Sequence, residues 1–207
     1  MTPCTTIEQA AKLIYSLYSQ KRQEHPALKQ QPFIISIDGR CASGKTTLAA
    51  KLAELIEHSS IVHLDDFFLQ PHQRTEKRYQ TPGRNVDDER LIQEVIQPYL
   101  NNQDISFRPF SCQKMALLEP IHLSKPDVLI LEGCYINNEL LNQYANIRIF
   151  THVDPQTQQK RIALRNGQDR LPDFINKWIP LEEKYFETLD LHKFDLLLDL
   201  SPLAPKK

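Results

Sequence analysis

A glycine-rich run in the first quarter of the chain has the spacing of a phosphate-binding loop. Residues 39–46 read Gly-Arg-Cys-Ala-Ser-Gly-Lys-Thr, which fits the pattern Gly-x₄-Gly-Lys-Ser/Thr. In such a loop a strand ends before the first glycine and a helix begins at the lysine. The backbone N–H groups of the turn between them, and the positive N-terminal end of the helix, then point toward the phosphates. In such a loop Lys45 contacts the β- and γ-phosphates, and the Thr46 hydroxyl is placed for Mg²⁺. The motif predicts binding of a nucleoside triphosphate with Mg²⁺.

The nucleotide is expected to lie along the whole loop, where the backbone N–H groups of a tightly turned chain face inward. The residues concerned are Gly39, Arg40, Cys41, Ala42, Ser43, Gly44, Lys45, Thr46 and Thr47. Cys41 is a special case, because a position beside a helix N-terminus and near a lysine lowers the pKa of a thiol. A reactive thiolate and an inert small side chain are both open readings of Cys41.

Two acidic residues follow apolar runs that are predicted to be strands. Asp65 follows residues 61–64, and Glu132 follows residues 128–131. In open α/β sheets, ligands bind beyond the carboxyl ends of the strands, so both side chains are expected to face the phosphate loop. One carboxylate can hold Mg²⁺ and another can accept the proton of an attacking hydroxyl group. An unpaired charge in a buried strand is costly, which favours a function for Glu132.

Further polar residues have both a functional and an ordinary interpretation. Arg161 and Arg165 lie four residues apart on a predicted helix and therefore share a face. Arginines on a mobile lid, here expected at residues 161–172, commonly neutralise a transferring phosphoryl group, whereas most helical arginines are simply solvated. The segment Asn85-Val86-Asp87 precedes another predicted helix, and on its own it indicates a helix cap at Asn85 or Asp87.

The elements that must position these residues alternate along the chain. Apolar runs predict strands at residues 33–37, 61–64, 128–131, 147–153 and 194–198. Helical periodicity predicts helices at residues 5–20, 45–57, 86–100, 155–165 and 171–189, the last with a break at Pro180. Alternating strands and helices predict an α/β fold with a five-stranded parallel sheet flanked by helices. Residues 105–123 interrupt this alternation and predict a hairpin over the sheet edge.

Length and composition restrict the class of protein. The 207 residues suffice for one domain, residues 1–207, with its N-terminal helix in residues 1–30. The net charge is −1 with both signs interleaved, which disfavours nucleic-acid binding. No apolar run approaches the roughly 20 residues of a membrane span, and the first ten residues lack the pattern of a signal peptide. We expect a soluble, cytoplasmic protein that binds neither nucleic acid nor membrane.

Together these segments resemble the uridine kinase family of P-loop kinases, which is itself similar to phosphoribulokinase, pantothenate kinase and nicotinamide riboside kinase. The resemblance covers about residues 33–199. It rests on Ile-Asp-Gly-Arg-Cys-Ala-Ser-Gly-Lys-Thr-Thr at 37–47, Leu-Asp-Asp-Phe-Phe at 64–68, Asn-Val-Asp at 85–87 and Leu-Glu-Gly at 131–133. It implies a P-loop NTPase kinase fold, with a small hairpin and a lid over the active site.

The resemblance also implies roles for the matching residues. Asp65 matches the catalytic base at the acceptor hydroxyl, Asp87 the acid that holds the ribose hydroxyls, and Glu132 the acid near Mg²⁺. Arg161 and Arg165 match the lid arginines, which stabilise the moving phosphoryl group together with Lys45. A hairpin with aromatic side chains covers the acceptor base in this family, and the residues at that place are Phe107, Arg108 and Phe110.

The chain departs from the family pattern around the acceptor. Its hairpin reads Phe-Arg-Pro-Phe-Ser at 107–111 in place of Tyr-Asp-Phe with a nearby histidine, and its lid is shorter. The leading hypothesis is an ATP- and Mg²⁺-dependent kinase for the 5′-hydroxyl of a nucleoside of the uridine or cytidine type. One alternative acceptor is another hydroxyl metabolite, such as a sugar phosphate, a vitamin precursor or a nicotinamide riboside-like compound. A nucleotide-dependent regulatory ATPase is the alternative of a different class. A homo-oligomer is compatible with the sequence.

Overall fold

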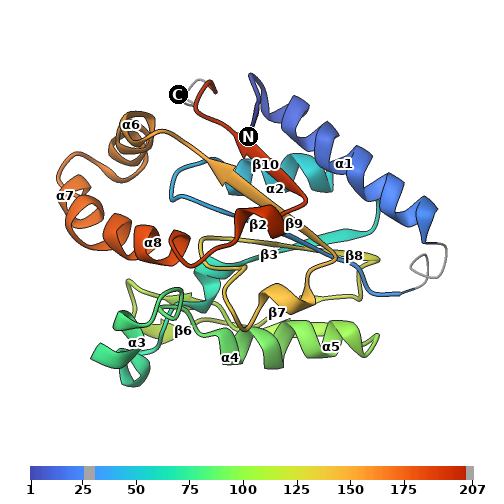
Figure 1. Ribbon diagram of the computed structural model, residues 1–207. Coiled ribbons are helices and arrows are strands. Elements are labelled where there is room, and N and C mark those ends of the chain that lie inside the picture. Colours follow the sequence, from blue (N-terminus) through green and yellow to red (C-terminus); the bar gives the residue numbers. More distant parts are fainter. Residues whose placement is uncertain (26–30, 204–207) are drawn as a thin grey trace.

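The computed structural model describes residues 1–25 and 31–203, so part of the predicted N-terminal segment 1–30 lies outside the described residues. The core is a six-stranded sheet with the order β1-β10-β9-β2-β8-β3, in which all neighbours are parallel (Figure 1). Its strands are β1 (Thr2–Pro3), β2 (Ile34–Gly39), β3 (Ser59–His63), β8 (Val128–Glu132), β9 (Ile147–His152) and β10 (Leu196–Asp199). The predicted α/β class and parallel sheet are confirmed.

The sheet has one strand more than the five that were predicted. The additional strand, β1, has only two residues and pairs with β10 at the sheet edge. Two residues are too few to give an apolar run in the sequence. Pro3 cannot donate a ladder hydrogen bond, and an edge strand tolerates this because one of its sides has no partner strand.

Helices cover both faces of the sheet (Figure 1). The α-helices of the described residues are α1 (Ile7–Glu24), α2 (Lys45–Ala53), α3 (Glu76–Gln80), α4 (Asp88–Leu91), α5 (Gln97–Leu100), α6 (Pro155–Asn166), α7 (Leu171–Asp173) and α8 (Ile179–Phe186). Helix α1 begins at a cap in which the Thr6 hydroxyl accepts a hydrogen bond from the Gln9 N–H at 3.0 Å. Helix α6 begins with Pro155 directly after its Asp154 cap, a position that needs no N–H donor.

Alternate residues of the central strands enter two different cores. Ile35 and Ile37 pack with α1 and α2 on one face of the sheet. Ile34 of the same strand and Leu129 of β8 pack on the other face with residues of the α4–α5 helical segment. A strand buried on both faces has a nearly continuous apolar sequence, as the Phe33–Ile37 segment does apart from Ser36. This burial fixes the register of the strands, and with it the place where each strand ends.

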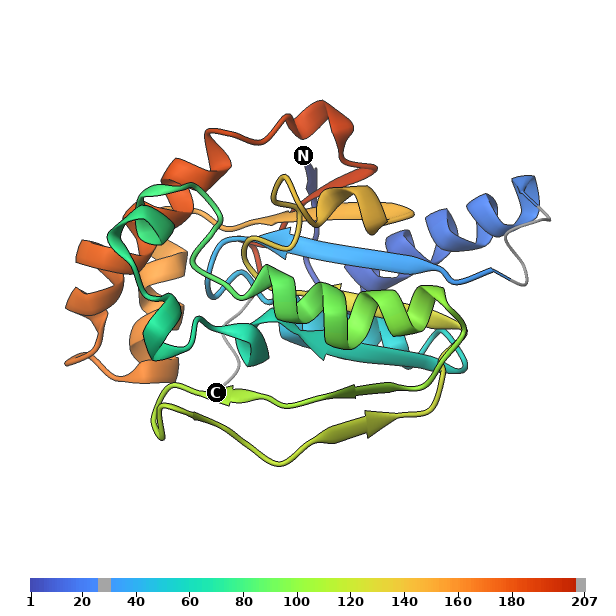
Figure 2. The same cartoon turned by 90° about the horizontal axis from the view of Figure 1, so that it is seen from below.

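An antiparallel hairpin over residues 105–123 lies beside the α4–α5 segment (Figure 2). Strand β4 (Ile105–Phe107) pairs with β7 (Ile121–Leu123), and β5 (Phe110–Ser111) pairs with β6 (Ala116–Leu117). Its buried side chains Ile105 and Phe107 belong to the core on that face of the sheet.

Two helical segments widen into a π-helical turn just before a proline. Residues Ile92–Ile96 precede α5, which contains Pro98, and residues Phe174–Trp178 precede α8, which contains Pro180. Proline removes one backbone donor and crowds the carbonyl four residues earlier, and a wider turn accommodates both effects. The helix therefore continues through Pro180, and the predicted break at this residue is wrong.

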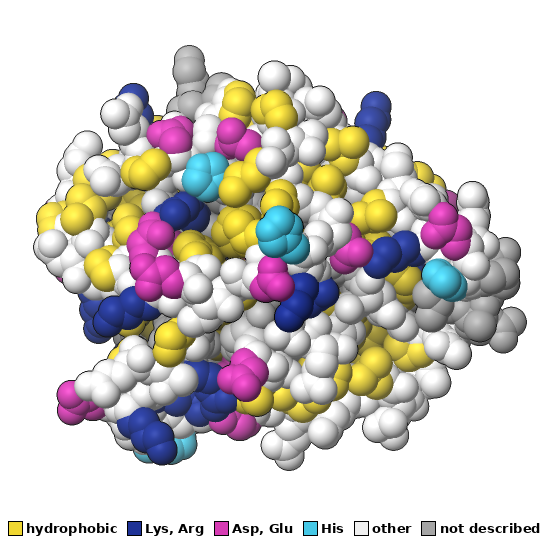
Figure 3. Space-filling model, viewed as in Figure 1, with side chains coloured by type: hydrophobic (Ala, Val, Ile, Leu, Met, Phe, Trp, Pro, Cys, Tyr) yellow, Lys and Arg dark blue, Asp and Glu magenta, His cyan; other side chains and the backbone are white. Residues whose placement is uncertain are grey.

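The surface mixes charges of both signs. On the face seen in Figure 3, the basic and acidic side chains of the described residues lie interspersed, in line with the net charge of −1. Among the helices of residues 1–25 and 31–203, none combines the length and the apolar character needed to cross a membrane.

Candidate active site

The phosphate loop connects the end of β2 to the start of α2, as the motif predicts. Gly39 and Gly44 both have positive φ angles, of 137° and 102°. A Cβ atom on Gly39 would lie 2.0 Å from the Thr151 carbonyl oxygen of β9, so only glycine fits between the strands. The Ser43 hydroxyl lies 2.7 Å from the Thr151 hydroxyl and ties the loop to the same strand. The loop is therefore held in shape by its neighbours in the sheet.

We expect Gly39→Ala to lower the free energy of unfolding by about 3 kcal/mol or more, since the substitution combines overlap with backbone strain. Gly44→Ala is the matched comparison. A Cβ on Gly44 would have only ordinary contacts of 3.8 Å and more, so the expected loss is that of backbone strain alone, about 1–2 kcal/mol. Chemical denaturation of both variants measures these losses. Equal stabilities of the two variants would contradict the close approach seen at Thr151.

Lys45 and Thr46 begin helix α2 inside the loop. The Lys45 ammonium group donates to the carbonyl oxygens of Gly39 and Arg40, both at 2.9 Å, and is buried. The Thr46 hydroxyl donates to the Glu132 carboxylate at 3.0 Å. The structure thus brings together three predicted residues, Lys45, Thr46 and Glu132, at the carboxyl end of the sheet.

Glu132 ends strand β8 and is paired with a histidine that the sequence analysis did not single out. Its carboxylate lies 2.5 Å from Nδ1 of His63, the last residue of the neighbouring strand β3. Burial favours the neutral acid, but the hydrogen bond from His63 and the charge of Lys45 outweigh it and lower the pKa of Glu132. The same hydrogen bond raises the pKa of His63. Glu132 is therefore held as an anion next to Thr46.

This pair of oxygen groups suits Mg²⁺. Magnesium usually takes one or two protein oxygen ligands and completes its shell with phosphate oxygens and water. Thr46 and Glu132 supply a hydroxyl and a carboxylate at adjacent positions. No group of three or more His, Cys, Asp or Glu side chains that could hold a metal occurs in residues 1–25 and 31–203.

Asp65 lies in the short helical turn Leu64–Phe67 that follows strand β3. Its side chain faces the cavity at the phosphate loop and remains open to solvent there. Partial desolvation by the surrounding protein raises the pKa of Asp65. The negative charge of the nearby Glu132 raises it further, and the positive charge of Lys45 partly opposes the rise. A solvent-accessible carboxylate of raised pKa has the properties of a general base.

A single large cavity of about 1340 Å³ joins these groups. Among the predicted residues, Cys41, Ala42, Gly44, Lys45, Thr46, Thr47, Asp65, Glu132, Arg161 and Arg165 line it. Gly39, Arg40 and Ser43 are not part of the lining and shape the loop from behind. Side chains that were not predicted as site residues also border the cavity, notably Arg74, Tyr79, Asn85, Trp178 and Glu182.

The two predicted lid arginines lie on α6 and have different contacts. Arg165 donates to the Cys41 sulfur at 3.2 Å and so leans over the loop. Arg161 donates to the carbonyl oxygens of Leu200 and Leu203 at 2.8 and 2.7 Å, which fastens the segment after β10 beside the loop. Arg165 is thus available to a phosphate, whereas much of the Arg161 hydrogen-bonding capacity is already used.

Of the two open readings of Cys41, the structure favours the inert side chain over a thiol of lowered pKa. Burial raises the pKa of this thiol, and the carboxylate of Glu182 raises it further, while Arg165 and Lys45 oppose the change. Glu182 lies 141 residues away in the chain. The local sequence around Cys41 therefore could not reveal the charge that decides its ionisation.

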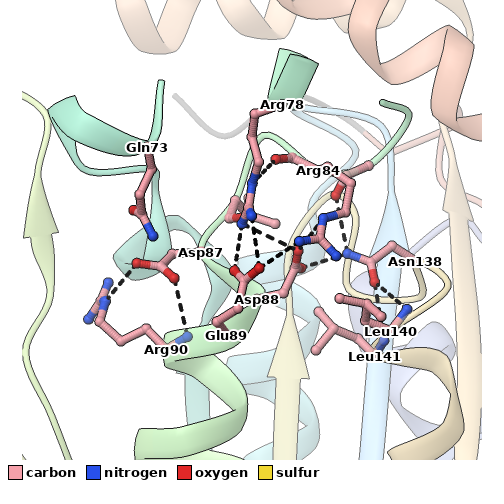
Figure 4. A network of polar contacts seen from close by, with 12 residues as sticks. Gln73, Arg78, Arg84, Asp87, Asp88, Glu89, Arg90, Asn138, Leu140 and Leu141 are labelled. Carbon is pink, nitrogen blue, oxygen red and sulfur yellow. Dashed lines mark hydrogen bonds and ion pairs between the residues drawn. The ribbon is translucent and has the colours of Figure 1, made fainter. Parts of the chain in front are cut away.

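Apart from Asp65, the residues predicted to bind the acceptor do not line the cavity. Asp87 is buried, caps α4 by accepting from the Arg90 N–H at 3.2 Å, and also pairs with the Arg90 side chain (Figure 4). Phe107 packs in the core with its ring 5.3 Å from that of Phe67. The Arg108 side chain donates to the carbonyl oxygens of the opposite hairpin strand. Their substrate role stays a prediction, as does that of Phe110, which is buried beside Arg74.

A second polar network beside Asp87 fixes the turn before α4 (Figure 4). Arg78 and Arg84 both pair with Glu89 at 2.6 Å, and Asp88 is fully buried beside them. Asn138 donates to Asp88 at 2.7 Å and to the carbonyl of Gly83, which joins this turn to the segment after β8. The network holds Asn85 and Val86 in place at the cavity wall.

Asp38 is a buried site residue that the sequence analysis missed. It is fully buried at the end of β2 and accepts hydrogen bonds from the Gly39, Tyr135 and Asn137 N–H groups and from the Tyr185 hydroxyl. It therefore anchors the loop to the segment after β8. The sequence does carry a signal for Asp38. An aspartate between an apolar run and the first glycine of the motif is expected to be buried, and a buried carboxylate needs hydrogen-bond partners.

Comparisons with known proteins agree with this geometry. A sequence model of the phosphoribulokinase/uridine kinase family matches residues 34–170. The chain is 30% identical to a uridine kinase of Geobacillus sp. over 176 residues. This match covers 76% of this chain and 82% of that protein. It is 28% identical to uridine-cytidine kinase B of Dictyostelium discoideum over 149 residues. This match covers 68% of this chain and 61% of that protein.

A solved structure described as a possible uridine kinase from Bacillus stearothermophilus has the same fold. Its TM-score to this chain is 0.63 at 18% identity, over 82% of this chain and 89% of that one. The family model spans the phosphate loop, Asp65, Glu132 and both lid arginines. The chain belongs to the phosphoribulokinase/uridine kinase family.

Proposed function

We propose that this protein transfers the γ-phosphoryl group of ATP, bound with Mg²⁺, to the 5′-hydroxyl of a nucleoside of the uridine or cytidine type. The observation that carries the proposal is the position of Asp65. This carboxylate faces the same cavity as Lys45 and the Thr46–Glu132 pair. A base and a phosphate-binding loop that share one cavity can hold a hydroxyl acceptor and a triphosphate next to each other.

Each group on the donor side has a definite task. The loop N–H groups and Lys45 bind the β- and γ-phosphates, and Arg165 lies where a lid arginine can reach the moving phosphoryl group. Thr46 and Glu132 are the residues that would hold Mg²⁺, which neutralises charge on the phosphates. Asp65 accepts the proton of the attacking hydroxyl. Positioning and electrostatic stabilisation supply most of the rate in such a reaction.

Aromatic and polar side chains support a planar acceptor. Tyr79 of α3 and Trp178 of the π-helical turn border the cavity from two different segments. Lys177 lies 5.5 Å from the Tyr79 ring and 4.5 Å from the Trp178 ring, so the two segments meet at the cavity. Asn85, Arg74 and Asp65 add hydrogen-bonding groups to the lining of the same cavity. Aromatic faces next to polar groups suit a base linked to a sugar.

A coupled assay of ADP release tests the proposal. The enzyme is supplied with ATP and Mg²⁺ and a panel of nucleosides, vitamins and sugar phosphates. We expect uridine or cytidine to stimulate ADP release, and the matching 5′-deoxynucleoside to give no stimulation because it lacks the acceptor oxygen. Stimulation by a different hydroxyl compound would replace the acceptor and keep the phosphotransferase. Nucleotide binding without stimulation by any compound would favour the regulatory ATPase instead.

A further inference from the structure

Glu182 is a buried carboxylate on the phosphate loop that the proposed reaction does not use. It lies on helix α8 with 4% of its surface exposed, and it borders the large cavity. Both of its oxygens lie 3.1 Å from the backbone nitrogen of Cys41, which donates to them. Glutamate is rarely buried to this extent unless it is paired. Its partner here is an N–H group of the loop that is expected to receive the phosphates.

Neighbouring contacts hold the same turn of the loop. Gln158 of α6 donates to the Cys41 carbonyl at 3.2 Å and to the Glu182 carboxylate at 3.3 Å. Arg40 forms an ion pair with Glu183, the next residue of α8. The helices on either side of the lid region, α6 and α8, are thus both attached to the first residues of the phosphate loop. Glu182 lies at the centre of this attachment.

The surroundings of Glu182 leave its charge only partly compensated. The ionisable groups that face it are Lys45 of α2, Arg40 and Cys41 of the loop, and Cys134 and Tyr135 of the segment after β8; α6 contributes the neutral Gln158. Burial raises the pKa of Glu182 to about 7, although Lys45, the Cys41 N–H and Arg40 act in the opposite direction. Near neutral pH the free protein therefore contains both the carboxylate and the neutral acid.

We propose that Glu182 is a positioning residue of the phosphate loop whose carboxyl group takes up a proton from solvent when the nucleoside triphosphate binds. The inference rests on the proposed binding of ATP at this loop. A triphosphate brings negative charge next to a buried carboxylate, which favours the neutral acid. As an acid, Glu182 can still accept the Cys41 N–H with its carbonyl oxygen, and its hydroxyl can donate to a phosphate oxygen. The proton returns to solvent when the nucleotide leaves.

The sign of the pH dependence follows from this step. The carboxyl pKa is higher in the complex than in the free protein, so binding takes up protons between the two values. ATP then binds most tightly at low pH, and its dissociation constant rises as the pH increases through about 7, by at most tenfold per pH unit for one proton. Above the pKa of the complex, the profile becomes flat again.

Calorimetric titration of the full chain with ATP and excess Mg²⁺, without an acceptor, tests the inference. Titration at pH 7.5 in two buffers of different ionisation enthalpy measures the protons exchanged on binding. We expect the wild type to take up about half a proton or more, and Glu182→Gln to take up close to none, because its amide does not titrate. Glu183→Gln is the matched control, since this neighbour has a side chain that is 45% exposed and contacts Arg40 instead of Cys41. It is expected to retain the uptake.

The outcomes separate this inference from the proposed function. Zero uptake or proton release by the wild type overturns the inference, and this measurement requires no variant. Equal uptake by wild type and Glu182→Gln overturns it as well. If Glu182→Gln does not fold, Glu182→Asp replaces it, and its uptake must follow a pH profile displaced from that of the wild type. Failure of ATP to bind at any pH would instead overturn the proposed function and, with it, the inference.

Discussion

Asp65→Asn is expected to lower kcat by about 10²- to 10⁴-fold, the range that general-base catalysis contributes. The substitution keeps the size of the side chain but removes the group that accepts the hydroxyl proton. The dissociation constant of ATP is expected to change by less than about threefold. Among the described residues, Lys45 and Thr46 of the phosphate loop form their hydrogen bonds with groups other than Asp65. Steady-state kinetics together with nucleotide binding by calorimetry measure both quantities.

The pH profile provides a second measurement of the same role. Asp65 is active as the carboxylate, and its pKa is raised by partial desolvation in the cavity wall and by the nearby Glu132. Activity is therefore lost as the pH falls through this raised value, above the usual range of an aspartate. Asp66→Asn is the control, because this neighbouring carboxylate does not line the cavity, and it should keep activity within about threefold. Near-normal turnover of Asp65→Asn would remove Asp65 from the reaction.

Lys45→Met is expected to lower kcat/KM by about 10³-fold or more and to weaken ATP binding, because the loop loses the ammonium group that is expected to contact the β- and γ-phosphates. Methionine fills a similar volume, and it removes a buried charge held by the Gly39 and Arg40 carbonyl groups. The fold is therefore expected to survive. Kinetics, with thermal unfolding as a check on the fold, measure the effect.

Lys12→Met is the control for a change of charge and shape away from the site. Lys12 is exposed on helix α1 and lies outside the cavity lining. Its kinetics should match those of the wild type within about twofold. A Lys45→Met enzyme with wild-type activity would mean that the phosphates bind elsewhere.

Features that depend on local sequence were predictable. The phosphate loop needs two glycines at fixed spacing, and its strand and helix neighbours carry their own apolar periodicity. Asp65 and Glu132 could be placed at one site because the carboxyl ends of parallel strands meet at one sheet edge. His63 belongs to the same edge but was missed, because a lone histidine at a strand end carries no spacing signal.

Features that depend on distant packing were not predictable. Glu182 and Glu183 occur in a charged helical segment, Leu-Glu-Glu-Lys, which is typical of a solvated face. Only the fold of α8 against the loop shows that one of them binds the Cys41 N–H and the other Arg40. For the same reason the local sequence left two readings of Cys41 open, and the raised pKa of its thiol favours the inert one.

The acceptor side shows the same limit. Aromatic residues in a hairpin can face a substrate or the core. Phe107 packs in the core, beside Phe67. Asp87 has a capping role in the structure, as its place before a helix indicates, while Asn85 of the same segment lines the cavity. Asn85 and Asp87 lie only two residues apart, yet their side chains have different surroundings in the fold. The local sequence pattern does not indicate which of the two lines the cavity.

Transfer of a labelled phosphoryl group tests the central claim most directly. The protein is incubated with ATP labelled at the γ-phosphate, Mg²⁺ and uridine or cytidine, and the products are separated and identified by mass spectrometry. The account predicts that the label appears on the 5′-oxygen of the nucleoside and that Asp65→Asn abolishes its appearance. Label found only as inorganic phosphate, or left entirely on ATP while ATP is bound, would contradict the account.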